Sequence, residues 1–325
     1  MRDILQKTIQ HKELTEEDVS AIVNSIVSNS FMVSQMSGLL CSLQTRMPMP
    51  SEIARFVRCL MKEARTLALS DAVDICGTGG DKKSTFNIST AVLFVLAGAG
   101  IKVAKHGNKA ISSSSGSFDV LAELGIRVPD DPSDSYQKTG VALLFAPLYH
   151  PAFKNIGPLR KELGVQTIFN ILGPLLNPGQ VRRQLMGVYD PGLVRPIALA
   201  MKELGHIHGM VVHGNGLDEI TVTGPSAVSE LTNGAVTDYT IDPIKYGIEY
   251  SPLDYLIVSS PKESAKVILD VLNGKKSPCR DIVILNSAAG IKIAGKAATF
   301  EQGIALAKEA IDSGKALQAL RRLQQ

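Results

Sequence analysis

A glycine-rich segment directly after an apolar run is the strongest chemical signal in the chain. It reads Gly77-Thr78-Gly79-Gly80. Glycine lets backbone N–H groups approach a ligand without interference from a Cβ atom, so such a loop can hold a phosphate group. The dinucleotide-binding pattern fails because Lys82 takes the place of its third glycine, and the P-loop pattern is absent as well. A glycine turn with a purely structural role is the alternative.

The segment that follows favours a phosphate site. Asn87-Ile88-Ser89-Thr90 places several side-chain oxygens before an apolar stretch, 91–99, that we expect to be helical. The first turn of a helix offers free N–H donors and the positive end of the helix dipole, which suit an anion. An ordinary helix cap needs only one such side chain. We therefore interpret the segment as part of an anion site.

A second segment repeats this arrangement. An apolar run at 101–104 leads into Lys105-His106-Gly107-Asn108-Lys109, then into a serine-rich stretch at 112–117 and a helix from about 118 to 124. In open α/β sheets, ligands bind beyond the carboxyl ends of the strands. Two such loops after successive strands can hold two phosphate groups. A flexible serine linker is the alternative.

Two further features could bind charged groups. Arg160 offers a planar fork of N–H donors that suits a carboxylate. The adjacent carboxylates Asp218 and Glu219 follow an apolar strand and a glycine turn, and such a pair suits Mg²⁺. A surface salt bridge for the arginine and an ordinary exposed acidic pair are the alternatives.

The pattern of apolar residues predicts the elements that carry these loops. The first seventy residues contain three helical patterns, one after Thr15, one at about 31–43 and one after Pro50 with Ser51 as its cap. Helical segments then alternate with short apolar runs, which is typical of an α/β fold with a mostly parallel sheet. Three short strands in 220–239 predict an antiparallel excursion, and a helix follows residue 290. The strands of the main sheet are expected at 72–76, 101–104, 141–145, 209–213 and 282–285.

Composition excludes several classes of protein. The 325 residues carry a formal charge of +3, so the bulk charge is not that of a nucleic-acid-binding protein. No secretory signal or membrane-spanning run is visible, and we expect no membrane partner. The four cysteines form no C-x-x-C pair, which predicts free thiols in a reducing cytoplasm.

Taken together, these motifs closely resemble the anthranilate phosphoribosyltransferase family over nearly the whole chain. The first three motifs belong to a wider superfamily that includes the pyrimidine nucleoside phosphorylases, whereas the segment from Phe169 to Pro174, Arg160 and the carboxylate pair indicate the anthranilate branch. The motifs that carry the resemblance are Gly77-Thr78-Gly79-Gly80-Asp81, Asn87-Ile88-Ser89-Thr90, Lys105-His106-Gly107-Asn108, Ser115-Gly116-Ser117, Phe145-Ala146-Pro147, 166–175 and Gly216-Leu217-Asp218-Glu219.

The resemblance assigns roles to individual residues. The matches to catalytic positions are Lys105, Asn108 and Arg160, and the matches to anthranilate-binding positions are Gly77, Asn108 and Arg160. Magnesium-binding positions match Ser89, Asp218 and Glu219. The positions expected to hold phosphoribosyl pyrophosphate are Gly77, Gly80, Asp81, Thr85, Asn87, Ile88, Ser89, Thr90, Lys105, Ser113 and Ser117.

The resemblance also implies an architecture and an activity. It implies a helical bundle domain at 1–70, joined by a returning segment near 165–178, and an α/β domain at 71–164 and 179–325, hinged together and paired as a homodimer. The implied activity is Mg²⁺-dependent transfer of a phosphoribosyl group to anthranilate. Two alternatives are a pyrimidine nucleoside phosphorylase, which needs no carboxylate pair for magnesium, and a non-catalytic paralogue that binds nucleic acid.

Four positions depart from the family pattern. Lys82 replaces a common glycine, Lys109 replaces arginine, Ser114 replaces lysine and Gln166 replaces a frequent arginine. Lysine keeps the charge but lacks the planar fork of arginine. The loss of two cations near the diphosphate is expected to weaken affinity for it, while every matched metal and anthranilate position is retained.

Overall fold

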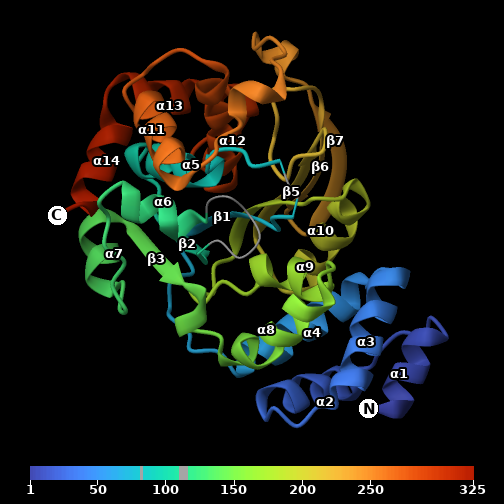
Figure 1. The fold of residues 1–325 in the computed structure, drawn as a ribbon. Helices are drawn as coiled ribbons and strands as arrows, with labels where there is room; N and C mark the ends of the chain where they lie inside the picture. Colours follow the sequence, from blue (N-terminus) through green and yellow to red (C-terminus); the bar gives the residue numbers. More distant parts are fainter. Residues whose placement is uncertain (81–82, 110–115) are drawn as a thin grey trace.

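A small helical bundle forms the N-terminal end of the molecule (Figure 1). The computed structural model describes residues 1–80, 83–109 and 116–325. Thr15 starts the second helix by a reciprocal cap, in which its hydroxyl accepts from the N–H of Asp18 and its own N–H donates to the Asp18 carboxylate. The bundle helices are α1 (Arg2–Ile9), α2 (Glu16–Val27), α3 (Val33–Arg46) and α4 (Pro50–Lys62).

The rest of the chain is built on one seven-stranded sheet. Its strand order is β3-β2-β1-β4-β5-β6-β7. The first five strands in this order are parallel, and β6 and β7 add an antiparallel hairpin at one edge. The strands are β1 (Val73–Gly77), β2 (Val103–Gly107), β3 (Val141–Phe145), β4 (Arg183–Gly187), β5 (His208–Gly214), β6 (Ser226–Thr232) and β7 (Ala235–Ile241).

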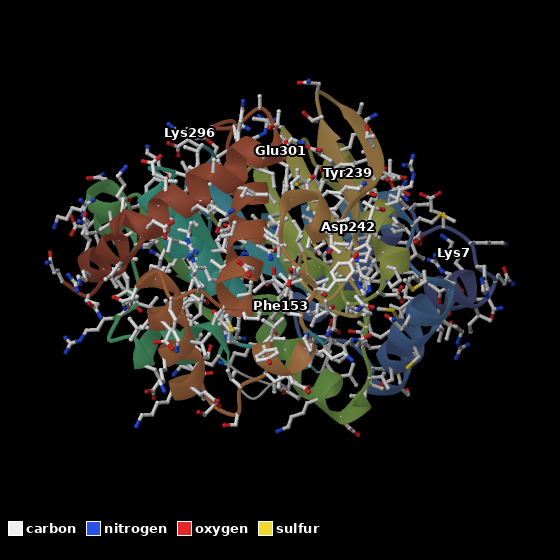
Figure 2. All side chains as sticks on the ribbon, turned by 90° about the horizontal axis from the view of Figure 1, so that it is seen from above. Lys7, Phe153, Tyr239, Asp242, Lys296 and Glu301 are labelled. Carbon is white, nitrogen blue, oxygen red and sulfur yellow. The ribbon has the colours of Figure 1, made fainter. Side chains whose placement is uncertain are left out.

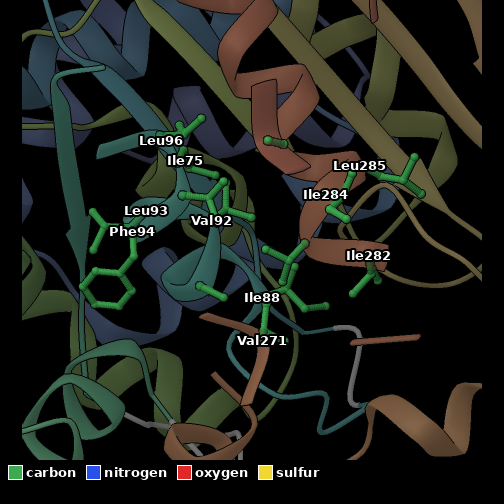
Figure 3. Close-up of a cluster of buried hydrophobic side chains, with 14 of the residues drawn as sticks. Ile75, Ile88, Val92, Leu93, Phe94, Leu96, Val271, Ile282, Ile284 and Leu285 are labelled. Carbon is green, nitrogen blue, oxygen red and sulfur yellow. The ribbon is translucent and has the colours of Figure 1, made fainter. Parts of the chain in front are cut away.

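Helices cover both faces of the parallel part of this sheet, so most residues of its strands β1 to β5 are buried. Alternation along a strand sends neighbouring side chains to opposite faces, so Leu185 packs with one core and Met186 with another. Figure 3 shows the first core, where side chains of α5 such as Val92 lie close to those of α12 such as Ile284. This core includes side chains of α5 (Ile88–Gly98), α6 (Ser117–Glu123), α11 (Pro261–Leu272), α12 (Pro278–Ile293), α13 (Phe300–Asp312) and α14 (Lys315–Leu323).

The second core joins the bundle to the sheet. Apolar side chains of α2, α3 and α4 pack in one cluster with those of α8 (Pro151–Leu163), α9 (Ile168–Leu175), α10 (Val194–Glu203) and the second sheet face. In the part of the chain that the structure describes, the remaining helices are α7 (Ser133–Thr139) and four short 3₁₀ turns. The bundle and the sheet therefore share an interface, as the absence of a linker predicts. Figure 2 shows Lys7 of α1 far from Lys296, which follows α12.

The structure corrects several expected elements. The segment 282–285 is not a strand but lies inside α12, and the structure has an unpredicted strand, β4, between β1 and β5. The antiparallel excursion contains two strands rather than three. Ser51 is not a cap, because α4 starts at Pro50 and the Ser51 hydroxyl donates to Glu13. Among the described residues, no helix is both long enough and apolar enough to cross a bilayer.

Candidate active site

The predicted loops meet at one edge of the sheet. Gly77 at the end of β1 lies in register with Gly187 at the end of β4, and Gly107 at the end of β2 lies in register with Phe145 at the end of β3. The carboxyl ends of parallel strands point the same way, so the loops that follow them gather at a common edge. The prediction that these loops share one edge is confirmed.

A tight turn carries the carboxylate pair back across this edge. Gly214 and Leu217 exchange two backbone hydrogen bonds of 2.9 and 3.0 Å, and Asn215 and Gly216 take positive φ values within the turn. Gly214 is also needed because a Cβ atom there would overlap the carbonyl oxygen of Glu219. The next residue after the turn, Asp218, is thereby directed over β1 and β4.

Asp218 packs against Gly77 and Gly187, whose lack of a Cβ atom leaves room for it. A Cβ atom on Gly77 would come within 2.9 Å of the Asp218 Cγ, and one on Gly187 would overlap the Asp218 backbone. Oδ2 of Asp218 accepts a hydrogen bond of 2.7 Å from the N–H of Gly79. The glycine-rich loop therefore positions a carboxylate as well as offering N–H donors. Gly187 has this role although the sequence did not single it out.

The first turn of α5 faces the same edge. Asn87 is the cap residue, so Ser89 and Thr90 lie in the first turn rather than before it. The N–H of Asn87 donates to the hydroxyl of buried Ser264 at 2.9 Å. Backbone pairing of 84–86 with 256–258, including a bridge from Thr85 to Ile257, supports the approach to the helix from the other side.

Lys105 lies beneath this helix with its ammonium group almost fully buried. It is 2% exposed, and Nζ donates to the Ser89 hydroxyl and to the Ile75 carbonyl, each at 3.0 Å. Burial lowers the pKa of Lys105, and the charges of Asp74 and Glu219 partly oppose that shift. The predicted lysine and two predicted magnesium positions, Ser89 and Glu219, thus lie near one another.

Asn108 and Lys109, which directly follow β2, make local contacts. The side-chain oxygen of Asn108 accepts from the N–H of exposed Lys109 at 2.8 Å, which leaves the amide group of Asn108 as a donor. Ser117 begins α6, and its hydroxyl donates to the carbonyl of Asn108 at 3.5 Å. The predicted residues Asp81 and Ser113, and the departures Lys82 and Ser114, lie outside the described residues.

Arg160 reaches from α8 towards the start of α9. Its Nη2 donates to Oδ1 of Asn170 at 3.3 Å, and its Cζ lies 5.5 Å from the centre of the Phe169 ring. Burial lowers the pKa of Arg160, but a guanidinium stays charged in proteins. Within the described part of the chain, no carboxylate pairs with Arg160. The alternative of a surface salt bridge is therefore not what the described residues show.

The start of α9 also contacts the glycine-rich loop. Nε2 of Gln166 donates to the carbonyl of Gly80 at 3.3 Å. Gly80 has a φ of +84°, and a Cβ atom there would come within 2.6 Å of this amide nitrogen. The residue before the helix cap therefore contacts the loop expected to hold diphosphate, while the first turn of α9 contacts Arg160.

A buried polar cluster fixes the other end of α9. Nδ1 of His106 lies 2.9 Å from Oδ2 of Asp74 as an ion pair without hydrogen-bond alignment, and Nε2 lies 2.9 Å from the carbonyl of Gly173. Both neighbours are acceptors, which favours a ring protonated on both nitrogens. Nε2 of Gln184 donates to Asp74 at 3.0 Å and to the carbonyl of Pro174 at 2.7 Å. The last carbonyls of α9 are thereby held by the sheet.

The sequence did not predict this cluster. Burial disfavours both charges, but the partner charge outweighs it, so the pKa of His106 is raised and the pKa of Asp74 is lowered. Cys76 lies in the same cluster, and burial raises the pKa of its thiol well above the usual range. The three strands that carry these side chains are adjacent in the sheet, which only the pairing reveals.

The donor set fits magnesium. A hydroxyl oxygen and two carboxylates, from Ser89, Asp218 and Glu219, are the hard oxygen ligands that Mg²⁺ takes in proteins, together with water and phosphate oxygens. All three belong to segments that meet at the same edge, through the Gly79–Asp218 bond and the contact of Lys105 with Ser89. We therefore treat this edge as a candidate site for an anionic, metal-bound substrate.

Two family models divide the chain between them. The a/b domain of the glycosyl transferase family matches residues 69–317, and the helical bundle domain of that family matches residues 2–64. The fold and the site thus define a glycosyl transferase with a helical bundle and an α/β domain.

Similar curated proteins show which family of glycosyl transferases this chain belongs to. Anthranilate phosphoribosyltransferases of a Thermoanaerobacter species and of Polynucleobacter necessarius are each 45% identical over 98% of this chain and 96% of their own length. This chain belongs to the anthranilate phosphoribosyltransferase family. The prediction of this branch, rather than the nucleoside phosphorylases, is confirmed.

Solved structures agree with the fold. The anthranilate phosphoribosyltransferase of Thermus thermophilus has a TM-score of 0.92 and 37% identity, with 99% of this chain and 98% of that chain covered. The Saccharomyces cerevisiae enzyme in complex with PRPP and Mg has a TM-score of 0.86 and 28% identity, with coverages of 99% and 96%. The predicted helical bundle joined to an α/β domain is confirmed.

Proposed function

We propose that this chain transfers the phosphoribosyl group of phosphoribosyl pyrophosphate to the amine of anthranilate, in tryptophan biosynthesis. The products are N-(5-phosphoribosyl)anthranilate and pyrophosphate. One observation carries the proposal: the Asp218 carboxylate lies at the same sheet edge as Lys105, Ser89 and the first turn of α5. The yeast relative, which was solved with PRPP and Mg, supports it.

The donor substrate binds along the ends of β1 and β2. The N–H groups of the glycine-rich loop and the first turn of α5 face its phosphate groups, and Lys105 supplies a buried cation. Magnesium held by Ser89, Asp218 and Glu219 would neutralise part of the diphosphate charge and so favour its departure. Asp81, Thr85, Ser113 and Ser117 complete this proposed donor set, in line with the family motif.

The acceptor binds on the side of α8 and α9. Arg160 pairs with the carboxylate of anthranilate, and the amide group of Asn108 donates to the same molecule, next to Gly77. Arg160 is suited to this role because its described partners are an amide oxygen and an aromatic ring rather than a carboxylate.

The reaction forms a bond from the anthranilate nitrogen to C1 of the ribose while the bond from C1 to the pyrophosphate oxygen breaks. The attacking amine is neutral and loses its proton as the product forms, so no strong base is needed. Among the histidines near the site, burial lowers the pKa of His150 to about 4, and His106 is committed to Asp74 and Gly173. The chain contributes by holding the reactants in line and by stabilising the departing charge with Lys105 and backbone N–H groups.

Three other predictions remain proposals. We retain the domain boundaries 1–70, 165–178, 71–164 and 179–325, which the shared packing of α9 with the bundle supports. We also retain a homodimer, supported by the exposed apolar side chains of Ile9, Met32 and Val33 on the bundle. The cytoplasmic location is supported by four free cysteines.

Paired substitutions test the assignment of the two substrate sites. Arg160→Ala is expected to raise the KM for anthranilate, and Asp218→Ala is expected to raise the KM for phosphoribosyl pyrophosphate and its dependence on Mg²⁺. Loss of a hydrogen bond to a charged group predicts an effect of about ten- to a hundredfold in each case. Arg195→Ala is the matched control, since Arg195 is exposed and pairs with Asp238. Equal effects of both variants on the two substrates would contradict these roles.

A further inference from the structure

Asn170 connects the start of α9 to the arginine of α8. Its Oδ1 accepts two hydrogen bonds, one of 3.0 Å from the backbone N–H of Thr167 and one of 3.3 Å from Nη2 of Arg160. Asn170 is half-buried, and Thr167 is fully buried. A single side-chain oxygen thus caps a helix and holds one edge of a guanidinium group.

Arg160 is held on a second side by an aromatic ring. Phe169 is buried, and its ring centre lies 5.5 Å from Cζ of Arg160, within the range of a cation–π contact. A guanidinium has five N–H donors, so contacts with one amide oxygen and one ring face leave donors for a ligand. The side chain is therefore oriented without being neutralised.

The orienting helix is itself fixed at both ends. The carbonyls of Gly173 and Pro174 near its C-terminus accept from His106 and Gln184 of the sheet, and Gln166 just before it contacts Gly80. Movement of Asn170 would disturb these contacts. Contacts at both ends of α9 therefore hold Asn170 in a fixed position next to Arg160.

We propose that Asn170 is a positioning residue that selects an acceptor with a carboxylate, because its uncharged oxygen orients the Arg160 fork and leaves the positive charge of that fork for the substrate. This inference rests on the proposed function. A carboxylate at position 170 would form an ion pair with Arg160, and charge-assisted bonds of this kind are roughly twice as strong as neutral ones. The substrate carboxylate would then compete with a built-in one.

Asn170→Asp tests this idea because it changes charge and little else. Aspartate has nearly the same shape, can still accept from the N–H of Thr167 and is favoured in the first turn of a helix. The chain is therefore expected to fold, as a thermal unfolding midpoint near that of the unchanged chain would verify. Asn24→Asp is the matched control, because Asn24 is exposed on α2 and gains the same charge.

The readout is the preference for anthranilate over anthranilamide, which carries a carboxamide in place of the carboxylate. The ratio of their kcat/KM values is expected to fall by about tenfold in Asn170→Asp. The KM for phosphoribosyl pyrophosphate is expected to stay within about twofold, and Asn24→Asp is expected to keep the full ratio. A merely structural disturbance would lower the use of both acceptors together and leave the ratio unchanged.

An unchanged ratio in folded Asn170→Asp would overturn the inference while leaving the proposed function intact. If that variant does not fold, Asn170→Ala decides, since loss of the orienting oxygen is expected to lower the ratio by about threefold. An unchanged ratio in Asn170→Ala would then overturn the inference. Absence of any turnover by the unsubstituted chain would refute the proposed function and this inference with it.

Discussion

The two glycines beneath Asp218 make the most specific structural prediction. Gly77 and Gly187 are register partners on β1 and β4, and both lie against Asp218. Gly187 contacts the backbone of Asp218, which cannot rotate away as the end of a side chain can. We predict that Gly187→Ala displaces Asp218 and weakens the binding of magnesium and diphosphate.

The structure sets the size of the effect. A Cβ atom on Gly187 would lie 3.1 Å from Cα of Asp218 and would overlap its carbonyl carbon and oxygen. Relief of the overlap needs a shift on the order of 1 to 2 Å, and overpacking of this kind costs about 1–3 kcal/mol of stability. The bond of 2.7 Å from the N–H of Gly79 to Oδ2 of Asp218 does not survive such a shift.

The assay combines kinetics with unfolding. The KM for phosphoribosyl pyrophosphate is measured over a series of Mg²⁺ concentrations, and the free energy of unfolding is measured in urea. Gly187→Ala is expected to raise that KM by about tenfold or more and to lower the free energy of unfolding by about 1–3 kcal/mol.

Gly38→Ala is the matched control. Gly38 lies inside α3 with ordinary φ, and an added Cβ would make ordinary van der Waals contact with Leu5 at 3.5 Å. Alanine is favoured over glycine in a helix, so this change is expected to stabilise the fold by about 0.5–1 kcal/mol without altering the KM. Gly187→Ala with the Mg²⁺ dependence and stability of the unsubstituted chain would refute the reasoning.

Three buried or half-buried groups give further predictions. The ion pair of His106 with Asp74 stabilises the fold while both are charged, and this contribution is lost as the pH rises through the raised pKa of His106. The free energies of unfolding of the unsubstituted chain and of His106→Gln, measured in urea from about pH 5 to about pH 9, are therefore expected to converge at the alkaline end. Burial raises the pKa of Glu230, but hydrogen bonds from His208, Lys292 and Tyr239 outweigh it and lower the pKa to about 2. Glu230→Gln is therefore expected to lower the free energy of unfolding in urea by about 1–3 kcal/mol at neutral pH, a difference that shrinks as the pH falls from 4.5 towards 2. Cys76, whose thiol has a raised pKa, is expected to resist iodoacetamide at neutral pH while exposed Cys41 reacts, as peptide mass spectrometry would measure; equal labelling of the two would contradict the assigned burial.

Much of the site was predictable because its chemistry is local. The loops at 77–80 and 105–109 each follow a short apolar strand, and hydroxyl side chains precede the next helix. Strand ends of a parallel sheet share an edge, so the sequence order was enough to bring these loops together. The position of Asp218 followed from the glycine turn before it.

The missed features depend on contacts between distant segments. Strand β4 reads Arg-Gln-Leu-Met-Gly, without the β-branched residues typical of a buried strand, and the apolar residues at 282–285 are buried on all sides of α12 and show no helical period. Gln184 and His106 meet Asp74 only through strand pairing. Gly187 likewise gains its role from Asp218, which comes 31 residues later in the chain.

The most direct test of the account is turnover by the unsubstituted chain. The chain is mixed with phosphoribosyl pyrophosphate, Mg²⁺ and anthranilate, and the fluorescence of anthranilate is followed over time. The account predicts a fluorescence loss that requires all three components and releases one pyrophosphate for each anthranilate consumed. Folded protein that leaves the fluorescence unchanged would contradict it.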